Sequence, residues 1–197
     1  DQRGDWAFHA GDAPLPGLAI SSQTGVELDV LMERGRVKLK VVVDSEYSET
    51  TMPIVCGYID APLQEEVLAI GHIMEQGAND NASGAAVIIE SLRALHSGTQ
   101  SGSLQPLRRC VRGLLVNECY GTIAFAAQNP GIVRRMIAGV NWDSLGRHQE
   151  SADGGFRHHC CPDASASVVD TLMILLLEAW MPKAAPYAPI KYERPYA

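Results

Sequence analysis

Four polar residues stand beside apolar segments of the chain in a way that suggests metal chemistry. His72, Glu118 and Asp143 each follow a short apolar run that is typical of a buried strand. Asp80 lies in a turn-rich segment, residues 77–84, just before an apolar pattern with helical spacing. Imidazole and carboxylate groups are ligands from which proteins build zinc sites. If these four residues meet, they supply most of a two-metal site, in which a shared carboxylate bridges the ions and a water is activated for attack on a carbonyl.

The elements that must position these residues are predicted from hydrophobic patterning. Apolar or alternating runs predict strands at residues 18–20, 36–43, 54–59, 66–71, 111–116 and 136–140. Apolar residues at helical spacing predict helices at 24–34, 85–98, 122–128 and 164–181, the first with a capping box that starts at Thr24. Strands that alternate with helices indicate an α/β domain with a mixed, largely parallel sheet flanked by helices. Sites in such sheets form at the carboxyl ends of the strands, so the four residues are expected to converge on one edge.

Composition excludes several classes of protein. The chain has 197 residues, 46% of them hydrophobic and 20% charged, which is sufficient for one domain with a hydrophobic core. A net charge of −7 argues against a nucleic-acid partner, which would require a basic surface. The sequence has no apolar run of about 18 residues, so we expect no membrane partner. Five cysteines without paired spacing do not indicate a disulfide framework, and they leave the compartment open.

Three segments resemble one enzyme family. Residues 70–72 and 77–84, IGH followed by GANDNASG, resemble the signature of the co-catalytic zinc aminopeptidases, the family of aminopeptidase Y and glutamate carboxypeptidase II. Residues 116–125, VNECYGTIAF, resemble the PExxGTxAY segment of a bacterial branch of that family. Residues 139–146, GVNWDSLG, resemble its GxNxDxxG segment. The matches follow the family's chain order, and together they cover residues 66–147.

The resemblance implies a zinc-exopeptidase fold and assigns a role to each residue. His72 and Asp143 would bind one zinc, Asp80 would bridge two zincs, and Glu118 would bind the second. Glu118 is also the expected catalytic carboxylate, which would shuttle a proton. The implied reaction is hydrolysis of the N-terminal peptide bond of a peptide substrate, with two Zn²⁺ ions as cofactors.

Three departures from the family pattern bear on activity. The family's adjacent Glu pair is Asn117-Glu118 here, so one carboxylate must serve twice or the base lies elsewhere. The orienting Asp or Cys two residues after the first histidine is replaced by Met74, and Glu75 is the nearest substitute. The family's last ligand is a histidine in a GGSDH-like segment. Residues 193–197 resemble the lead-in to that segment, so we expect this ligand beyond the end of the chain.

The resemblance also suggests how the chain is divided. Residues 1–50 are expected to be the end of a protease-associated-like insert or a lead-in that starts after the native N-terminus. Residues 51–197 are expected to be a catalytic domain that is incomplete at its C-terminus. Two alternatives stay open, a non-catalytic relative that acts as a binding or assembly module and a hydrolase of another amide on the same scaffold. A cut edge that exposes apolar surface would favour a homo-oligomer.

Two further segments are assigned no site role. Residues 158–161, His-His-Cys-Cys, have side chains of metal-ligand type. Adjacent side chains point in different directions, so we expect no metal there. Residues 172–180 form an apolar stretch that we expect to pack in the core or at an interface.

Overall fold

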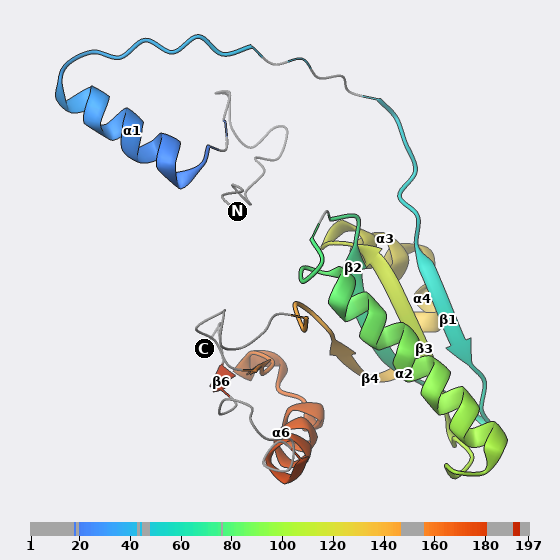
Figure 1. Cartoon of the computed structure of the whole chain (residues 1–197). Coiled ribbons are helices and arrows are strands. Elements are labelled where there is room, and N and C mark those ends of the chain that lie inside the picture. Colours follow the sequence, from blue (N-terminus) through green and yellow to red (C-terminus); the bar gives the residue numbers. More distant parts are fainter. Residues whose placement is uncertain are drawn as a thin grey trace. The chain divides into compact units, whose positions relative to one another are not determined.

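The computed structural model describes residues 18, 20–42, 44, 48–75, 77–146, 156–180 and 191–193. The chain separates into two compact units, Asp1–Glu49 and Thr50–Ala197 (Figure 1). The first unit contains α1 (Ser22–Glu33). Its cap is Ser21, whose side chain accepts a hydrogen bond from the Thr24 backbone N–H, so the cap predicted at Thr24 was wrong by one turn. The identity of residues 1–50 as an insert or lead-in stays a prediction.

The strands predicted before residue 50 do not form in the described residues. Leu18, Ile20 and residues 36–42 have no strand structure, while Ala19 and Val43 lie outside the described residues. Large apolar side chains here are exposed, including Leu39 and Val42. Alternating polarity makes a segment compatible with a strand, but the backbone groups also need a neighbouring strand with which to pair.

The second unit is built on a four-stranded sheet. Its strands are β1 (Val55–Ile59), β2 (Leu63–Ile73), β3 (Arg109–Asn117) and β4 (Met136–Asn141), in the spatial order β1-β3-β2-β4. β2 pairs in parallel with both β3 and β4, and β1 pairs antiparallel to β3. The mixed, largely parallel sheet predicted from the sequence is confirmed.

Helices cover both faces of this sheet (Figure 1). α2 (Ala82–Ser101) packs through Ala85 and Ile88 against Leu115 of β3. α3 (Tyr120–Gln128) packs through Phe125 against Leu114 and Val116, on the opposite face. The short α4 (Pro130–Val133) follows α3 and leads into β4. Consecutive β3 residues therefore point to opposite sides, as strand geometry requires, and each side is buried under a helix.

The parallel pairing places three strand ends at the same edge. In register, His72 of β2 lies beside Val116 of β3, and Ile70 of β2 lies beside Asn141 of β4. Glu118 and Asp143 each come two residues after those register partners. The carboxyl ends of β2, β3 and β4 thus bring the predicted ligands to one edge, as expected for this class of fold.

The last described elements are short strands and one helix. β5 (Arg157–His159) pairs in parallel with β6 (Lys191–Glu193), and α6 (Val168–Trp180) lies between them in sequence after the 3₁₀ turn Asp163–Ser165. The helix predicted from residue 164 starts four residues later because that turn precedes it. Met181, where the predicted helix ended, and residues 182–190 and 194–197 lie outside the described residues. Leu172, Leu175 and Trp180 are more than half exposed, so this face of α6 is not part of the described core. Among the described residues, no helix is both long enough and apolar enough to cross a membrane.

Candidate metal centre

His72 is the most buried member of the site. It lies near the end of β2, in register with Val116 of β3, and its side chain is 8% exposed. Its Nε2 atom lies 3.4 Å from Asp80 Oδ1 and 3.4 Å from Asp143 Oδ1. Within the described residues neither ring nitrogen has a hydrogen-bond partner. Buried polar atoms normally have one, so an imidazole beside carboxylate oxygens at these distances indicates a site for a shared cation.

The GANDNASG segment explains why Asp80 and Asp143 meet. Asn81 is 1% exposed, and its side chain caps α2 by accepting a hydrogen bond from the Gly84 backbone N–H. The same side chain donates to the Trp142 carbonyl (3.0 Å) and accepts from the Ser144 N–H (3.2 Å). Asn81 therefore ties the start of α2 to the residues on either side of Asp143.

Two further side chains of the same segment reinforce that link. Ser83 Oγ accepts a hydrogen bond from the Leu145 N–H (2.8 Å), and Asn79 Oδ1 accepts one from the Gly146 N–H (2.9 Å). Both partners lie in the loop after β4, more than 60 residues away in sequence. The three polar side chains of the segment thus position one carboxylate-bearing loop against the other.

Gly84 is required by this close approach. A Cβ atom at Gly84 would clash with Asn81 Oδ1 and with the Trp142 carbonyl oxygen. Since both atoms belong to the link between the two loops, a side chain here would separate Asp80 from Asp143.

Two more carboxylates lie on the other side of the imidazole. Glu75 Oε2 is 3.2 Å from His72 Nδ1, and ligand atoms of His72, Glu75 and Glu118 lie within 4.8 Å of one another. Burial raises the pKa of Glu75 to about 7, together with hydrogen bonds from its carboxyl group to Glu118 and Asp80 and the negative charge of Asp80. The charge of His72 acts in the opposite direction. Glu75 therefore lies between two other acids and holds its proton up to near-neutral pH.

The turn after each of the three strands contains a residue with positive φ. Met74 follows β2 (φ 82°), Cys119 follows β3 (φ 54°) and Ser144 follows β4 (φ 52°), and these are the positive-φ residues other than glycine among those described. Such conformations cost roughly 1–3 kcal/mol each and occur often at functional sites. Each of them lies within two residues of His72, Glu118 or Asp143.

The structure brings all four predicted ligands to one cluster. His72, Asp80 and Asp143 form one group of potential metal ligands, and Glu118 joins His72 through a second group that contains Glu75. Glu75, named from the sequence only as a substitute orienting residue, contacts the imidazole directly. The positioning role of Asn81 was missed, although an Asn directly before a helix is a recognisable cap signal.

The charges and donor types of this cluster fit a zinc ion. Glu75, Asp80, Glu118 and Asp143 surround a single imidazole, and none of these carboxylates pairs with a lysine or arginine within the described residues. Nitrogen and oxygen donors of this kind are those that catalytic zinc sites use. The side chains of Asp80 and Asp143 are 60% and 46% exposed, so the open side of the cluster is accessible to water and substrate.

The sequence matches the profile of Peptidase family M28 over residues 40–172, more than half of the 197-residue chain. The chain belongs to peptidase family M28. The matched region includes every residue of the His72 cluster. M28 membership agrees with the donor set, because the family consists of metal-dependent peptidases that generally bind zinc. The narrower placement beside aminopeptidase Y and glutamate carboxypeptidase II stays a prediction.

A solved structure shares the fold of this chain. The crystal structure of a "putative peptidase" from Clostridium acetobutylicum superposes with a TM-score of 0.54 at 18% sequence identity. The match covers 73% of this chain but 30% of that one, so this M28 chain spans less than a third of that protein. At this identity the likeness establishes the fold alone. A comparison with curated proteins gave no match.

Proposed function

We propose that this M28 chain carries the metal-binding face of a two-zinc aminopeptidase, which hydrolyses the N-terminal peptide bond of a peptide. The observation that carries the proposal is the buried His72 imidazole with two carboxylate oxygens, from Asp80 and Asp143, each 3.4 Å from Nε2. The preference for N-terminal bonds rests on the resemblance of residues 77–84 to the aminopeptidase signature.

The proposed ligand sets follow the two groups at His72. His72, Asp80 and Asp143 would hold one zinc, and Glu118 would hold the second with Asp80 as the bridge. Bound zinc would polarise the scissile carbonyl and lower the pKa of a bound water.

Proton transfer during hydrolysis is assigned to carboxylates of the protein. Glu118 is proposed as the proton-transfer group, and Glu75, whose carboxyl group hydrogen-bonds to it, is a second carboxyl group within reach of the same site. Glu75 Oε2 also contacts His72 Nδ1, and such a contact fixes the ring orientation and leaves Nε2 for a metal.

One observation favours a second candidate. Asn117, the last residue of β3, occupies the position where the family has the first Glu of its pair. A chain that had lost its base could keep the metal site and serve as a binding or assembly module. The position of Glu75 supports the enzyme instead, because it places a second carboxyl group beside Glu118 that can replace the missing base.

Metal content and amide hydrolysis together test the proposal. The purified chain would be loaded with zinc, desalted and measured by elemental analysis, alongside Asp80→Asn and a matched control, Glu90→Gln, on an exposed position of α2. We expect the parent and the control to retain about two more zincs per chain than Asp80→Asn retains. Substrates would be aminoacyl nitroanilides with either a free or an acetylated N-terminus.

Each outcome separates one alternative. Cleavage of the free-amine substrate alone supports an aminopeptidase, and cleavage of the acetylated one supports a hydrolase of another amide. Retained zinc without cleavage supports the binding module. Zinc retained equally by the parent and Asp80→Asn would show that the bridging assignment is wrong.

A further inference from the structure

A second cluster of ligand-type side chains lies outside the His72 cluster. His158 is in β5, Cys160 follows that strand directly, and Asp170 is in the first turn of α6. One ligand atom from each of these residues lies within 4.8 Å of the other two. The three residues combine nitrogen, sulfur and oxygen donors, a set that contains each donor type zinc accepts from proteins.

Strand geometry accounts for a pairing that the sequence argument dismissed. Adjacent residues in a strand point to opposite sides, but residues two apart share a side. His158 and Cys160 therefore face the same way, whereas His159 between them is exposed. The third donor, Asp170, is nine residues beyond Cys161 and could not be assigned to the pair from local spacing.

The separations suit a small divalent cation. His158 Nε2 lies 3.8 Å from Asp170 Oδ1. Metal–ligand distances of about 2.0–2.3 Å in a tetrahedral site place neighbouring ligand atoms roughly 3.3–3.8 Å apart. Two ligand atoms at the 4.8 Å limit of the group would therefore have to approach each other by roughly 1.0–1.5 Å for binding.

Burial and orientation distinguish the cluster from a chance grouping of surface residues. Cys160 is 6% exposed, and the side chains of His158 and Asp170 are 13% and 15% exposed. The Cys161 backbone N–H donates to Asp170 Oδ2 (3.1 Å), and this bond directs the other oxygen, Oδ1, toward His158. A hydrogen bond that fixes a ligand in this way is a usual support of protein metal sites.

We propose that His158, Cys160 and Asp170 bind one zinc-class divalent cation, at a site separate from the His72 centre. The three protein ligands leave one position for water or another donor. The cation would link β5 to α6, and Cys160 would lose its thiol proton on binding. The proposal does not depend on peptidase activity, because none of its residues belongs to the His72 cluster.

The neighbouring thiol is a built-in control. Burial raises the pKa of the Cys161 thiol. Its pKa is also raised by the charge of Asp170, by a hydrogen bond between the Cys161 and Asp170 side chains, and by the charge of Cys160. Cys161 is not one of the three residues of the group, so its replacement should leave the bound metal in place. Cys119 is an exposed thiol next to Glu118, so it could bind a metal at the His72 centre and produce a thiolate signal of its own. A Cys119 variant is therefore a second control.

Cobalt(II) titration of the full chain tests the proposal. A thiolate bound to Co²⁺ gives a sulfur-to-metal charge-transfer band in the near ultraviolet, which imidazole and carboxylate ligands do not produce. The titration would use the parent, Asp80→Asn to disable the His72 centre, Cys160→Ser, and the controls Cys161→Ser and Cys119→Ser. We expect the band in the parent, in Asp80→Asn and in both controls, and its loss in Cys160→Ser. In Asp80→Asn, where the His72 centre no longer competes for the metal, the band should saturate at one Co²⁺ per chain.

Two further variants keep the test decisive if Cys160→Ser does not fold. Asp170→Asn and His158→Gln should each weaken the cobalt affinity measured from the band by more than the roughly 10–100-fold that loss of a supporting hydrogen bond costs. A parent without the band, a band that survives Cys160→Ser, or affinity unchanged in both Asp170→Asn and His158→Gln would overturn the proposal.

Discussion

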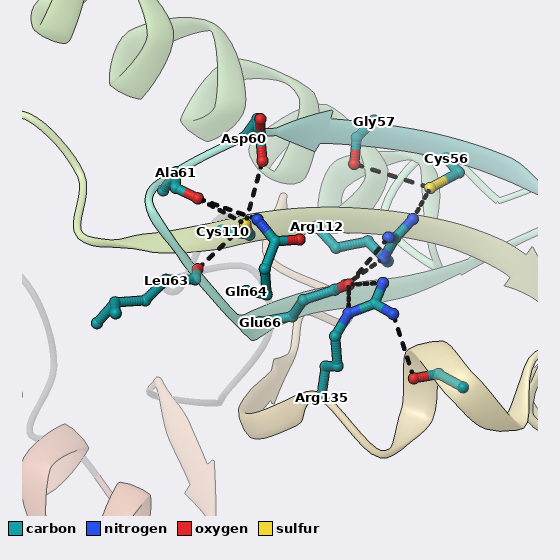
Figure 2. A network of polar contacts seen from close by, with 11 residues as sticks. Cys56, Gly57, Asp60, Ala61, Leu63, Gln64, Glu66, Cys110, Arg112 and Arg135 are labelled. Atoms are coloured by element: carbon teal, nitrogen blue, oxygen red, sulfur yellow. Dashed lines mark hydrogen bonds and ion pairs between the residues drawn. The ribbon is translucent and has the colours of Figure 1, made fainter.

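The two ends of β2 differ in how their carboxylates are paired. At one end a carboxylate is paired with arginines, and at the other end several carboxylates have no basic partner among the described residues. Glu66, near the start of the strand, and His72, near its end, are six residues or about 20 Å apart. Glu66 is 0% exposed, and it accepts hydrogen bonds from Arg112 Nε (2.6 Å) and Arg135 Nη2 (2.6 Å) (Figure 2). At His72, four carboxylates gather around one imidazole without a lysine or arginine partner among the described residues.

The Glu66 end is a completed polar network (Figure 2). Arg112 also donates to Cys56 Sγ (2.9 Å) and lies 4.6 Å from the centre of the Tyr58 ring. Nearby, the buried Cys110 thiol donates to the Leu63 carbonyl (3.4 Å). The charged and polar groups of this region therefore satisfy one another, and their role is to join β1, β2 and β3 to the segment after α4.

The contrast indicates which charged region is structural and which is functional. A buried charge with its counter-charges in place needs nothing from outside the protein, and removing one partner is costly. Crowded carboxylates oppose folding unless a cation joins them, so a cluster of four around one imidazole points to a ligand. The pKa shifts agree, because the pKa of Glu66 is lowered and that of Glu75 is raised to about 7.

The largest expected effect is on Glu66. Glu66→Gln leaves the nearly buried Arg112 without its counter-charge, and we expect the free energy of unfolding to fall by about 3–5 kcal/mol. Urea denaturation of the metal-free chain at pH 7 measures this loss. A decrease of less than about 1 kcal/mol, the value for an exposed pair, would mean that the network is not structural.

The pH dependence of that loss sharpens the test. Burial alone would raise the pKa of Glu66, but the hydrogen bonds from Arg112 and Arg135 outweigh it and lower the pKa below 4.5. Ionised Glu66 therefore stabilises the fold at pH values above 4.5, and this contribution is lost as the pH falls through the lowered pKa. The difference between parent and Glu66→Gln should shrink under those acidic conditions and stay constant near neutrality.

At the other end of β2 we expect a change of intermediate size, in which stability depends on pH in the opposite direction. Because the pKa of Glu75 is raised from 4.5 to about 7, the folded state binds its proton more tightly than the unfolded state does. The metal-free chain should lose stability as the pH rises from about 4.5 to about 7, and Glu75→Gln should reduce that loss. Thermal unfolding across this pH range, in the presence of a chelator, makes the measurement.

Two results would count against this interpretation of the carboxylate cluster. A Glu75→Gln variant with the same pH dependence as the parent would mean that Glu75 is not crowded by its neighbours. Persistence of the same pH-dependent loss in zinc-saturated parent would mean that a cation does not relieve the crowding.

The smallest effect is expected at Glu65, which is adjacent to Glu66 in sequence. Its ion pair with Arg109 has a distance of 2.6 Å, but the two side chains are 48% and 44% exposed. Glu65→Gln should therefore cost less than about 1 kcal/mol, and salt should abolish even that loss. The same urea experiment provides the value, and a loss as large as that of Glu66→Gln would remove the distinction between buried and exposed pairs.

Local pattern was sufficient to predict the main sheet, whereas the candidate ligands were named from strand-end positions and a family resemblance. Strands at residues 54–59, 66–71, 111–116 and 136–140 were predicted because each is an apolar run of strand length, and all four form. The strand predicted at residues 36–43 was wrong over its described part, since pairing depends on a neighbouring strand that local sequence does not specify.

Contacts between distant segments were decided by tertiary packing. Asn81 reaches the loop after β4 across 61 residues, and Glu75 meets Glu118 only because parallel pairing aligns the ends of β2 and β3. In the same way, Asp170 joins His158 and Cys160 through the placement of α6 beside β5. Residue type and strand periodicity are local properties and can be read along the chain, whereas the partners of a side chain depend on which segments the hydrophobic core brings together.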